Sequence, residues 1–181
     1  MCIPMTTLST PVAIDARATA EHVGSPVSIR FRERVRNRIG RSELLAFHLG
    51  GERFAFDVRA LDEVLDAPLV ELLPQGDPTM VGLTTHHSRP IPVFDTSRVL
   101  GMPATCGRSV LVMRSGHRRV GLLVDEVDDV ISIDLSRLQP PPFGTDDDLL
   151  LGVSWTHGVL SAILDARALI AACQPRGAEA P

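Results

Sequence analysis

The chain has 181 residues, of which 44% are hydrophobic and 22% are charged, values typical of a soluble globular protein with one domain. No segment approaches the roughly 20 consecutive apolar residues of a membrane-spanning helix. The N-terminus lacks the basic and apolar regions of a secretory signal. We therefore expect a cytoplasmic protein with no direct membrane insertion.

The three cysteines, Cys2, Cys106 and Cys173, lie far apart and form no CxxC motif. Such spacing is typical of reduced thiols in a cytosolic protein rather than of a disulfide framework or a zinc site. We expect Cys106 and Cys173 to pack in the protein interior.

Residues 1–41 differ from the rest of the chain, because they carry a net charge of +4 against −8 for the remainder. The segment is rich in Thr, Ala, Ser and Pro, which predicts a largely disordered N-terminal extension. Residues 30–41 are rich in arginine, at nearly every second position, a spacing that suits a solvated basic linker or a strand with one basic face. An arm that binds nucleic acid is the third alternative. The segment lacks the interleaved aromatic side chains that stack on bases, so no nucleic acid is expected as a partner.

From residue 42 onward, short β-branched and apolar runs alternate with turns rich in Gly and Pro, which predicts an all-β sandwich or barrel with short helices. Strands are expected at residues 44–49, 54–57, 91–94, 110–114, 120–124, 150–155 and 160–164. Short helices are expected at residues 58–65, 96–100 and 166–173. Asp95 and Asp165 each precede one of these helices, where a carboxylate accepts hydrogen bonds from free backbone N–H groups. We interpret both as N-caps.

An internal repeat organises this region. Residues 43–74 align with residues 109–140 at an offset of 66, and eight of the 32 positions are identical. The identical pairs are Leu45/Leu111, Gly50/Gly116, Arg53/Arg119, Asp62/Asp128, Val64/Val130, Leu69/Leu135, Leu72/Leu138 and Pro74/Pro140. The rest of each half aligns at an offset of 70, which matches Gly82, His87 and Asp95 with Gly152, His157 and Asp165.

The repeat predicts one domain at residues 42–174, with a first half at about residues 43–108 and a second half at about residues 109–174, followed by a flexible tail at residues 175–181. Halves of about 65 residues are small for separate stable cores, so we expect them to share one. The duplication therefore predicts two small β-barrels related by a pseudo-two-fold axis.

Several blocks of this region have a familiar order and spacing. Phe47-His-Leu-Gly is followed by Gly82-Leu-Thr with Ile91-Pro-Val-Phe-Asp95, and then by Gly121-Leu-Leu-Val-Asp125. Together they resemble the CheW-like domain family over about residues 43–174. The resemblance implies two SH3-like five-stranded barrels related by a pseudo-two-fold and a C-terminal helix. It gives structural roles to Gly50, Gly82, Asp95, Gly116, Gly121, Gly152 and Asp165.

The resemblance also implies a non-catalytic adaptor that is recruited to membrane-associated receptor arrays. Its expected partners are the regulatory domain of a CheA-type histidine kinase and the cytoplasmic tip of methyl-accepting chemoreceptors. The positions matching the family motifs assign partner binding to Val58, Glu63, Leu83, Thr84, His87 and Ile91. Val127 and Val130 of the second half are candidates for the kinase contact, and which face meets which partner stays open. Plain core packing is the alternative for Val58, Leu83 and Ile91.

One loop departs from the family pattern. Where the family usually reads Asn-Leu-Arg-Gly, this chain reads Thr85-His-His-Ser88, so the family's arginine falls on His87. Glu63 matches the acidic residue of the family. Because histidine is largely neutral near pH 7 while arginine is always charged, we expect a weaker, pH-dependent contact between Glu63 and His87.

No catalytic motif, nucleotide motif or cofactor site is recognisable, so we predict no enzyme activity and no cofactor. The adjacent His86 and His87 lack the partners of a four-ligand zinc site, so no metal is expected. Two alternatives remain, which are a regulator that responds to a ligand or metal near the histidine loop and a nucleic-acid-binding protein that uses the arginine-rich arm. Trp155 is either a core residue or an interface anchor.

Overall fold

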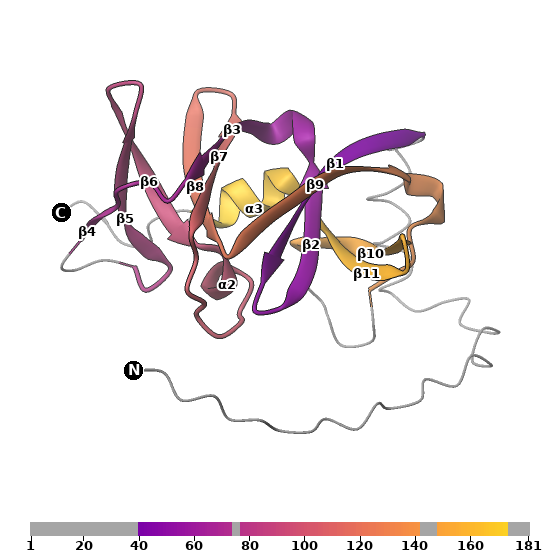
Figure 1. Ribbon diagram of the computed structural model, residues 1–181. Coiled ribbons are helices and arrows are strands. Elements are labelled where there is room, and N and C mark those ends of the chain that lie inside the picture. Colours follow the sequence, from indigo (N-terminus) through magenta and orange to yellow (C-terminus); the bar gives the residue numbers. More distant parts are fainter. Residues whose placement is uncertain (1–39, 74–76, 142–147, 174–181) are drawn as a thin grey trace, which may run out of the picture.

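The computed structural model describes residues 40–73, 77–141 and 148–173, which form two antiparallel-rich sheets and short helices (Figure 1). The strands are β1 (Arg41–Leu49), β2 (Glu52–Asp57), β3 (Leu61–Asp66), β4 (Glu71–Leu72), β5 (Met80–His86), β6 (Arg89–Asp95), β7 (Ser109–Ser115), β8 (Arg118–Val124), β9 (Glu126–Asp134), β10 (Leu150–Thr156) and β11 (Val159–Leu164). The helices are α2 (Thr96–Val99) and α3 (Ala166–Ala172), with 3₁₀ turns η1 (Val58–Ala60) and η2 (Leu135–Arg137). Neither α2 nor α3 is long and apolar enough to cross a membrane.

Each sheet combines strands from both halves of the repeat. One sheet has the order β10-β11-β2-β1-β9, and the other has the order β3-β7-β8-β6-β5-β4. We call the first the β1 barrel and the second the β7 barrel. In Figure 1 they lie on the right and on the left. The halves of the sequence are therefore interlocked, because neither half supplies all the strands of one barrel.

The strand register confirms the duplication. Leu44 pairs with Asp57 between β1 and β2, and the residues 66 positions later, Val110 and Leu123, pair between β7 and β8. The hairpins β5–β6 and β10–β11 likewise match at an offset of 70, with a register shift at the same place. Two unrelated sheets would not repeat their pairings and their irregularities together, so the pseudo-two-fold relation is real.

A hydrophobic core lies where the two barrels meet. It includes Phe47 and Phe56 from the β1 barrel, Leu111 and Leu122 from the β7 barrel, and Leu169 from α3. Figure 1 shows α3 between the two sheets. A second core cluster lies within the β1 barrel and includes residues of β1, β9 and β11. The shared core is the physical reason that the two barrels form one unit.

Equivalent ion pairs also join the halves. Arg53 Nη2 lies 2.7 Å from Asp128 Oδ2, and Arg119 Nε lies 2.8 Å from Asp62 Oδ2. Each pair joins one half of the sequence to the other, and both arginines and both aspartates are identical in the repeat. The identities that revealed the duplication therefore include residues that hold the interlocked halves together.

The helix predicted at residues 58–65 is wrong. Only Val58–Ala60 form a 3₁₀ turn, and the chain then continues as the strand β3, which pairs with β7. The apolar residues Leu61, Val64 and Leu65 have the i, i+3, i+4 spacing of a helix, but tertiary pairing with β7 overrides this local pattern. The strands β4, β5 and β9 also lie outside the ranges predicted as strands: β4 has only two residues, β5 contains a glycine, and acidic residues interrupt the apolar pattern of β9.

The two helices after β6 and β11 begin where the aspartates stand. The Asp95 carboxylate accepts hydrogen bonds from the backbone N–H groups of Ser97 and Arg98, and Asp165 accepts from those of Arg167 and Ala168. These bonds satisfy donors that have no partner inside the helix. Equivalent caps therefore start equivalent helices in both halves.

The cysteines differ in environment. Cys173 is buried next to α3, and this burial raises the pKa of its thiol to about 12, so the thiol stays protonated and acts as a packing residue. The expectation for Cys106 is wrong, because this residue is exposed in the long connection between α2 and β7. The predictions for residues 1–39 and 175–181 lie outside the described residues.

Candidate functional site: the histidine hairpin and the open barrel edge

The β5–β6 hairpin carries the histidine pair at its tip. His87 and Ser88 form the two-residue turn, and both have positive φ angles, of 47° and 60°. Two consecutive positive φ angles are the mark of the tight hairpin turn that matches the twist of the strands. The preceding residue, His86, closes β5 on the buried side of the strand, after Gly82 and Thr84.

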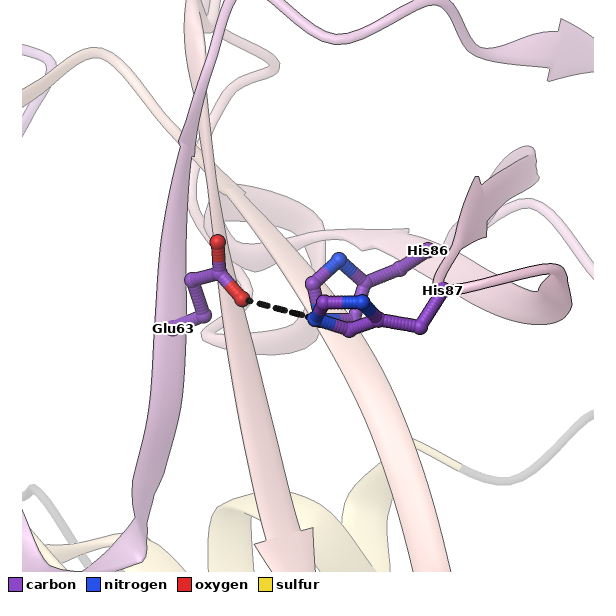
Figure 2. Close-up of side chains that lie close together, drawn as sticks. All are labelled: Glu63, His86 and His87. Carbon is purple, nitrogen blue, oxygen red and sulfur yellow. Dashed lines mark ion pairs between the residues drawn. The ribbon is translucent and has the colours of Figure 1, made fainter.

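Glu63 of the edge strand β3 faces both histidines, as Figure 2 shows. Its Oε2 atom lies 2.9 Å from His86 Nε2 and 3.6 Å from His87 Nε2. The two imidazole rings have centroids 3.9 Å apart and are inclined at 65°. The side chain of His86 is 9% exposed, whereas that of His87 is 75% exposed. A buried imidazole and an exposed one therefore converge on one carboxylate oxygen.

The sequence predicted the contact of Glu63 with His87 but missed His86, which is the closer partner. Alternation along β5 was the signal that could have found it. Gly82, Thr84 and His86 are two residues apart and all buried, so they share one face of the strand. The turn at His87 then brings a neighbouring side chain, which would otherwise point to the opposite face, onto the same side.

The β7 barrel exposes large apolar side chains beside this hairpin. Val64 on β3 is 38% exposed, and the segment after β3 exposes Leu69 at 83%, Leu72 at 75% and Leu73 at 42%. We call Leu69, Leu72 and Leu73 the leucine strip. Next to it is a cleft of about 460 Å³, lined by residues that include Leu65, Leu69, Leu83, Thr84 and Pro90.

The other barrel buries the same leucines. Leu135 and Leu138, the repeat partners of Leu69 and Leu72, are only 6% and 7% exposed and belong to the core of the β1 barrel. Identical residues of the repeat are therefore buried in the β1 barrel and exposed on the β7 barrel. Sequence reasoning had no means of finding this difference, because the repeat suggests the same environment for both pairs.

Gly82 positions the segment that carries the leucine strip. A Cβ atom at Gly82 would lie 2.1 Å from the backbone oxygen of Glu71 in β4. The short strand β4 can therefore pair with β5 only because residue 82 has no side chain. Thr84 adds a hydrogen bond, donated by its Oγ1 atom to the Leu69 carbonyl at 2.9 Å.

The profile of the CheW-like domain matches residues 43–174, which include both barrels. The chain belongs to the CheW-like domain family. A chemotaxis protein CheW of Rhizobium meliloti is 30% identical over 125 residues, which cover 67% of this chain and 79% of the relative. Protein FrzA of Myxococcus xanthus is 31% identical over 126 residues, with the same coverage of both chains.

A solved structure shares the fold. The scaffolding protein TtCheW from Thermoanaerobacter tengcongensis superimposes with a TM-score of 0.62 at 23% identity, over 69% of this chain and 89% of that one. The two SH3-like barrels expected from the sequence are thus confirmed as the fold of this CheW-like domain.

The positions that match the family motifs do not form one exposed patch. Glu63, His87 and Val130 are exposed, and Val58, Leu83 and Val127 are half-buried. Thr84 and Ile91 are only 3% and 1% exposed, so in this fold they support neighbouring strands rather than offer contact area. Trp155, which the sequence left between two interpretations, is 63% exposed on the β10–β11 hairpin.

Ser88 occupies a backbone conformation that favours glycine, the residue that CheW-like domains usually carry there. The equivalent position in the β10–β11 hairpin is Gly158, with a φ of 79°. We expect Ser88→Gly to raise the free energy of unfolding by about 1 kcal/mol, because a side chain in the left-handed region costs about this much. Urea denaturation measures the change.

A matched control is Ser132→Gly in the extended strand β9, where Ser132 is exposed. That substitution should lower stability by roughly 0.5–1 kcal/mol, since glycine weakens a strand interior. Equal effects of the two substitutions would contradict the role assigned to the turn.

Proposed function

We propose that this CheW-like protein is a non-catalytic adaptor of chemosensory signalling in the cytoplasm, which couples chemoreceptors to a CheA-type histidine kinase. Its partners are the kinase regulatory domain and the cytoplasmic tip of a methyl-accepting receptor. Membership of the family supports this role, as does the likeness to proteins whose names describe chemotaxis and scaffolding.

The leucine strip is the observation that carries the proposal. A monomeric protein gains by burying large apolar side chains, and the β1 barrel does bury the equivalent leucines. Leu69 and Leu72 instead stay exposed beside a cleft lined by both apolar and polar side chains, which suits a surface that a partner covers. The adjacent edge strand β3 offers further backbone groups for pairing.

The two edge strands of the β7 barrel, β3 and β4, have an acidic character. Asp66, Glu71 and Glu63 lie on β3 and β4, and all three are exposed. Acidic side chains around an apolar centre favour a partner with complementary basic groups and speed its association. They also discourage pairing of either edge strand with a second copy of the same chain.

Reconstitution tests the proposed function. The full chain is mixed with a CheA-type kinase and a receptor cytoplasmic fragment, and complex formation and kinase autophosphorylation are measured with and without it. We expect the chain to bind the isolated regulatory domain and to bring the kinase and the receptor fragment into one complex. Failure to bind the regulatory domain would overturn the proposal, and so would failure to bind the receptor fragment.

A further inference from the structure

We propose that Glu63, His86 and His87 form a binding site for one divalent transition-metal ion such as Zn²⁺. Within the described residues, their ligand atoms lie within 4.8 Å of one another. The donors would be Nε2 of each histidine and the carboxylate of the glutamate (Figure 2). This inference concerns the chain alone and does not depend on the proposed adaptor function.

The distances suit a shared ion. Zinc bonds to imidazole nitrogen and carboxylate oxygen are about 2.0–2.2 Å long, so two ligand atoms in a tetrahedral site lie roughly 3.4 Å apart. The two separations from Glu63 Oε2, 2.9 Å to His86 Nε2 and 3.6 Å to His87 Nε2, lie on either side of this value. Only small side-chain rotations are needed to place an ion between the three groups.

The backbone holds the three donors in place. His86 is 8% exposed at the end of β5, so its imidazole has little freedom to turn away. His87 lies next to it in the tight turn, and Glu63 lies across from both on the edge strand β3. Donors preorganised on two strands lose less conformational freedom when an ion binds than donors on a loose loop would.

The donor set selects the type of ion. Two imidazoles and one carboxylate suit Zn²⁺, Cu²⁺ or Ni²⁺, whereas Ca²⁺ and Mg²⁺ prefer sites made of oxygen ligands. Three protein ligands leave a coordination position open for water or another donor. Such a site can exchange its ion, in contrast to a structural zinc site with four protein ligands. No metal was expected from the sequence at these histidines, because they lack the partners of a four-ligand zinc site, and a site with three protein ligands departs from that expectation.

The pseudo-two-fold supplies an internal control. His157 occupies the equivalent turn of the β10–β11 hairpin with a φ of 51°, close to that of His87. The positions equivalent to Glu63 and His86 hold Asp129 and Thr156, and Thr156 offers no imidazole. The same turn geometry without the same donors should therefore bind no ion.

Titration of the untagged full chain with ZnCl₂ tests the proposal. Calorimetry should give one Zn²⁺ per chain near pH 7.5. In histidine NMR spectra, Zn²⁺ should shift the imidazole signals of His86 and His87 while those of His157 stay unchanged. Mg²⁺ should produce neither effect.

His87→Asn is the informative variant, because asparagine tolerates a positive φ and leaves the turn intact. It should weaken Zn²⁺ binding at least tenfold, as should Glu63→Gln, while the matched control His157→Asn should leave binding unchanged. A thermal stability equal to that of the unmodified chain confirms that each of the three variants is folded. Zn²⁺ affinity that is unaffected by both His87→Asn and Glu63→Gln, or the absence of Zn²⁺ binding to the unmodified chain, would overturn the proposal.

Discussion

Replacement of Leu135 or Leu138 by alanine is expected to lower the free energy of unfolding by about 2–4 kcal/mol. The same replacement at Leu69 or Leu72 should change it by less than about 0.5 kcal/mol. The two pairs are identical in the repeat, but Leu135 and Leu138 are 6% and 7% exposed while Leu69 and Leu72 are 83% and 75% exposed. Urea denaturation of the four variants measures the difference.

Partner binding should be more sensitive to alanine at Leu69 and Leu72 than stability is. If the leucine strip contacts a partner, the double variant Leu69→Ala/Leu72→Ala should bind the kinase regulatory domain or the receptor fragment at least about tenfold more weakly. Its stability should stay close to that of the unmodified chain. Val159→Ala, an exposed apolar residue of the β1 barrel, is the control for a general loss of apolar surface. Full retention of both interactions in the double variant would remove the leucine strip from the interface.

The second large effect is expected at the ion pairs that join the halves. Asp128→Asn should destabilise the protein by about 2 kcal/mol, because it leaves Arg53 nearly buried without its counter-charge. The Arg53 side chain is 9% exposed, and its Nε atom has no hydrogen-bond partner among the described residues. The remaining interaction with Asp128 therefore carries most of the compensation for burying that guanidinium group.

The equivalent substitution in the first half of the repeat, Asp62→Asn, should lower the free energy of unfolding by less. Asp62 contacts Arg119 and Arg114, whose side chains are 34% and 57% exposed, so water replaces the lost interaction. We expect Asp62→Asn to destabilise by no more than about 1 kcal/mol, with an effect that shrinks in high salt. Denaturation at low and high ionic strength compares the two variants. A larger loss for Asp62→Asn would show that exposure does not govern these pairs.

Much of the fold could be predicted because the duplication leaves its mark on the sequence. The matched columns Gly50/Gly116 and Arg53/Arg119 gave the correct offset, and the strand pairings repeat at that offset. Short apolar runs in β1, β2, β7 and β8, bounded by turn residues, were sufficient to place those strands. The exchange of strands between halves could not be predicted, since a barrel closed within one half requires the same periodicity.

The candidate site was less accessible to sequence reasoning. Glu63 and His87 were identified from the family pattern, but the helix expected at residues 58–65 would have placed Glu63 on a different kind of element. His86 lies on the buried face of β5 because of strand alternation, and His87 joins it at the same carboxylate because of a positive φ that no composition rule reveals. Exposure of the leucine strip depends on how the segment after β3 leaves its barrel, whereas the repeat implies one environment for both pairs of identical leucines.

The interlocked barrels also constrain how the chain acquires its structure during synthesis. β1 pairs with β9, and Leu44 lies opposite Ile131 in this pairing. The sheet therefore cannot extend beyond β1 until β9 has been synthesised. The hairpin β1–β2 emerges early from the ribosome with both outer edges unpaired, and only the arrival of β11 covers the second edge. Pairings so distant along the chain favour slow completion and a long interval of exposed strand edges. A nascent chain of this design therefore has most need of protection from aggregation until its final hairpin is made.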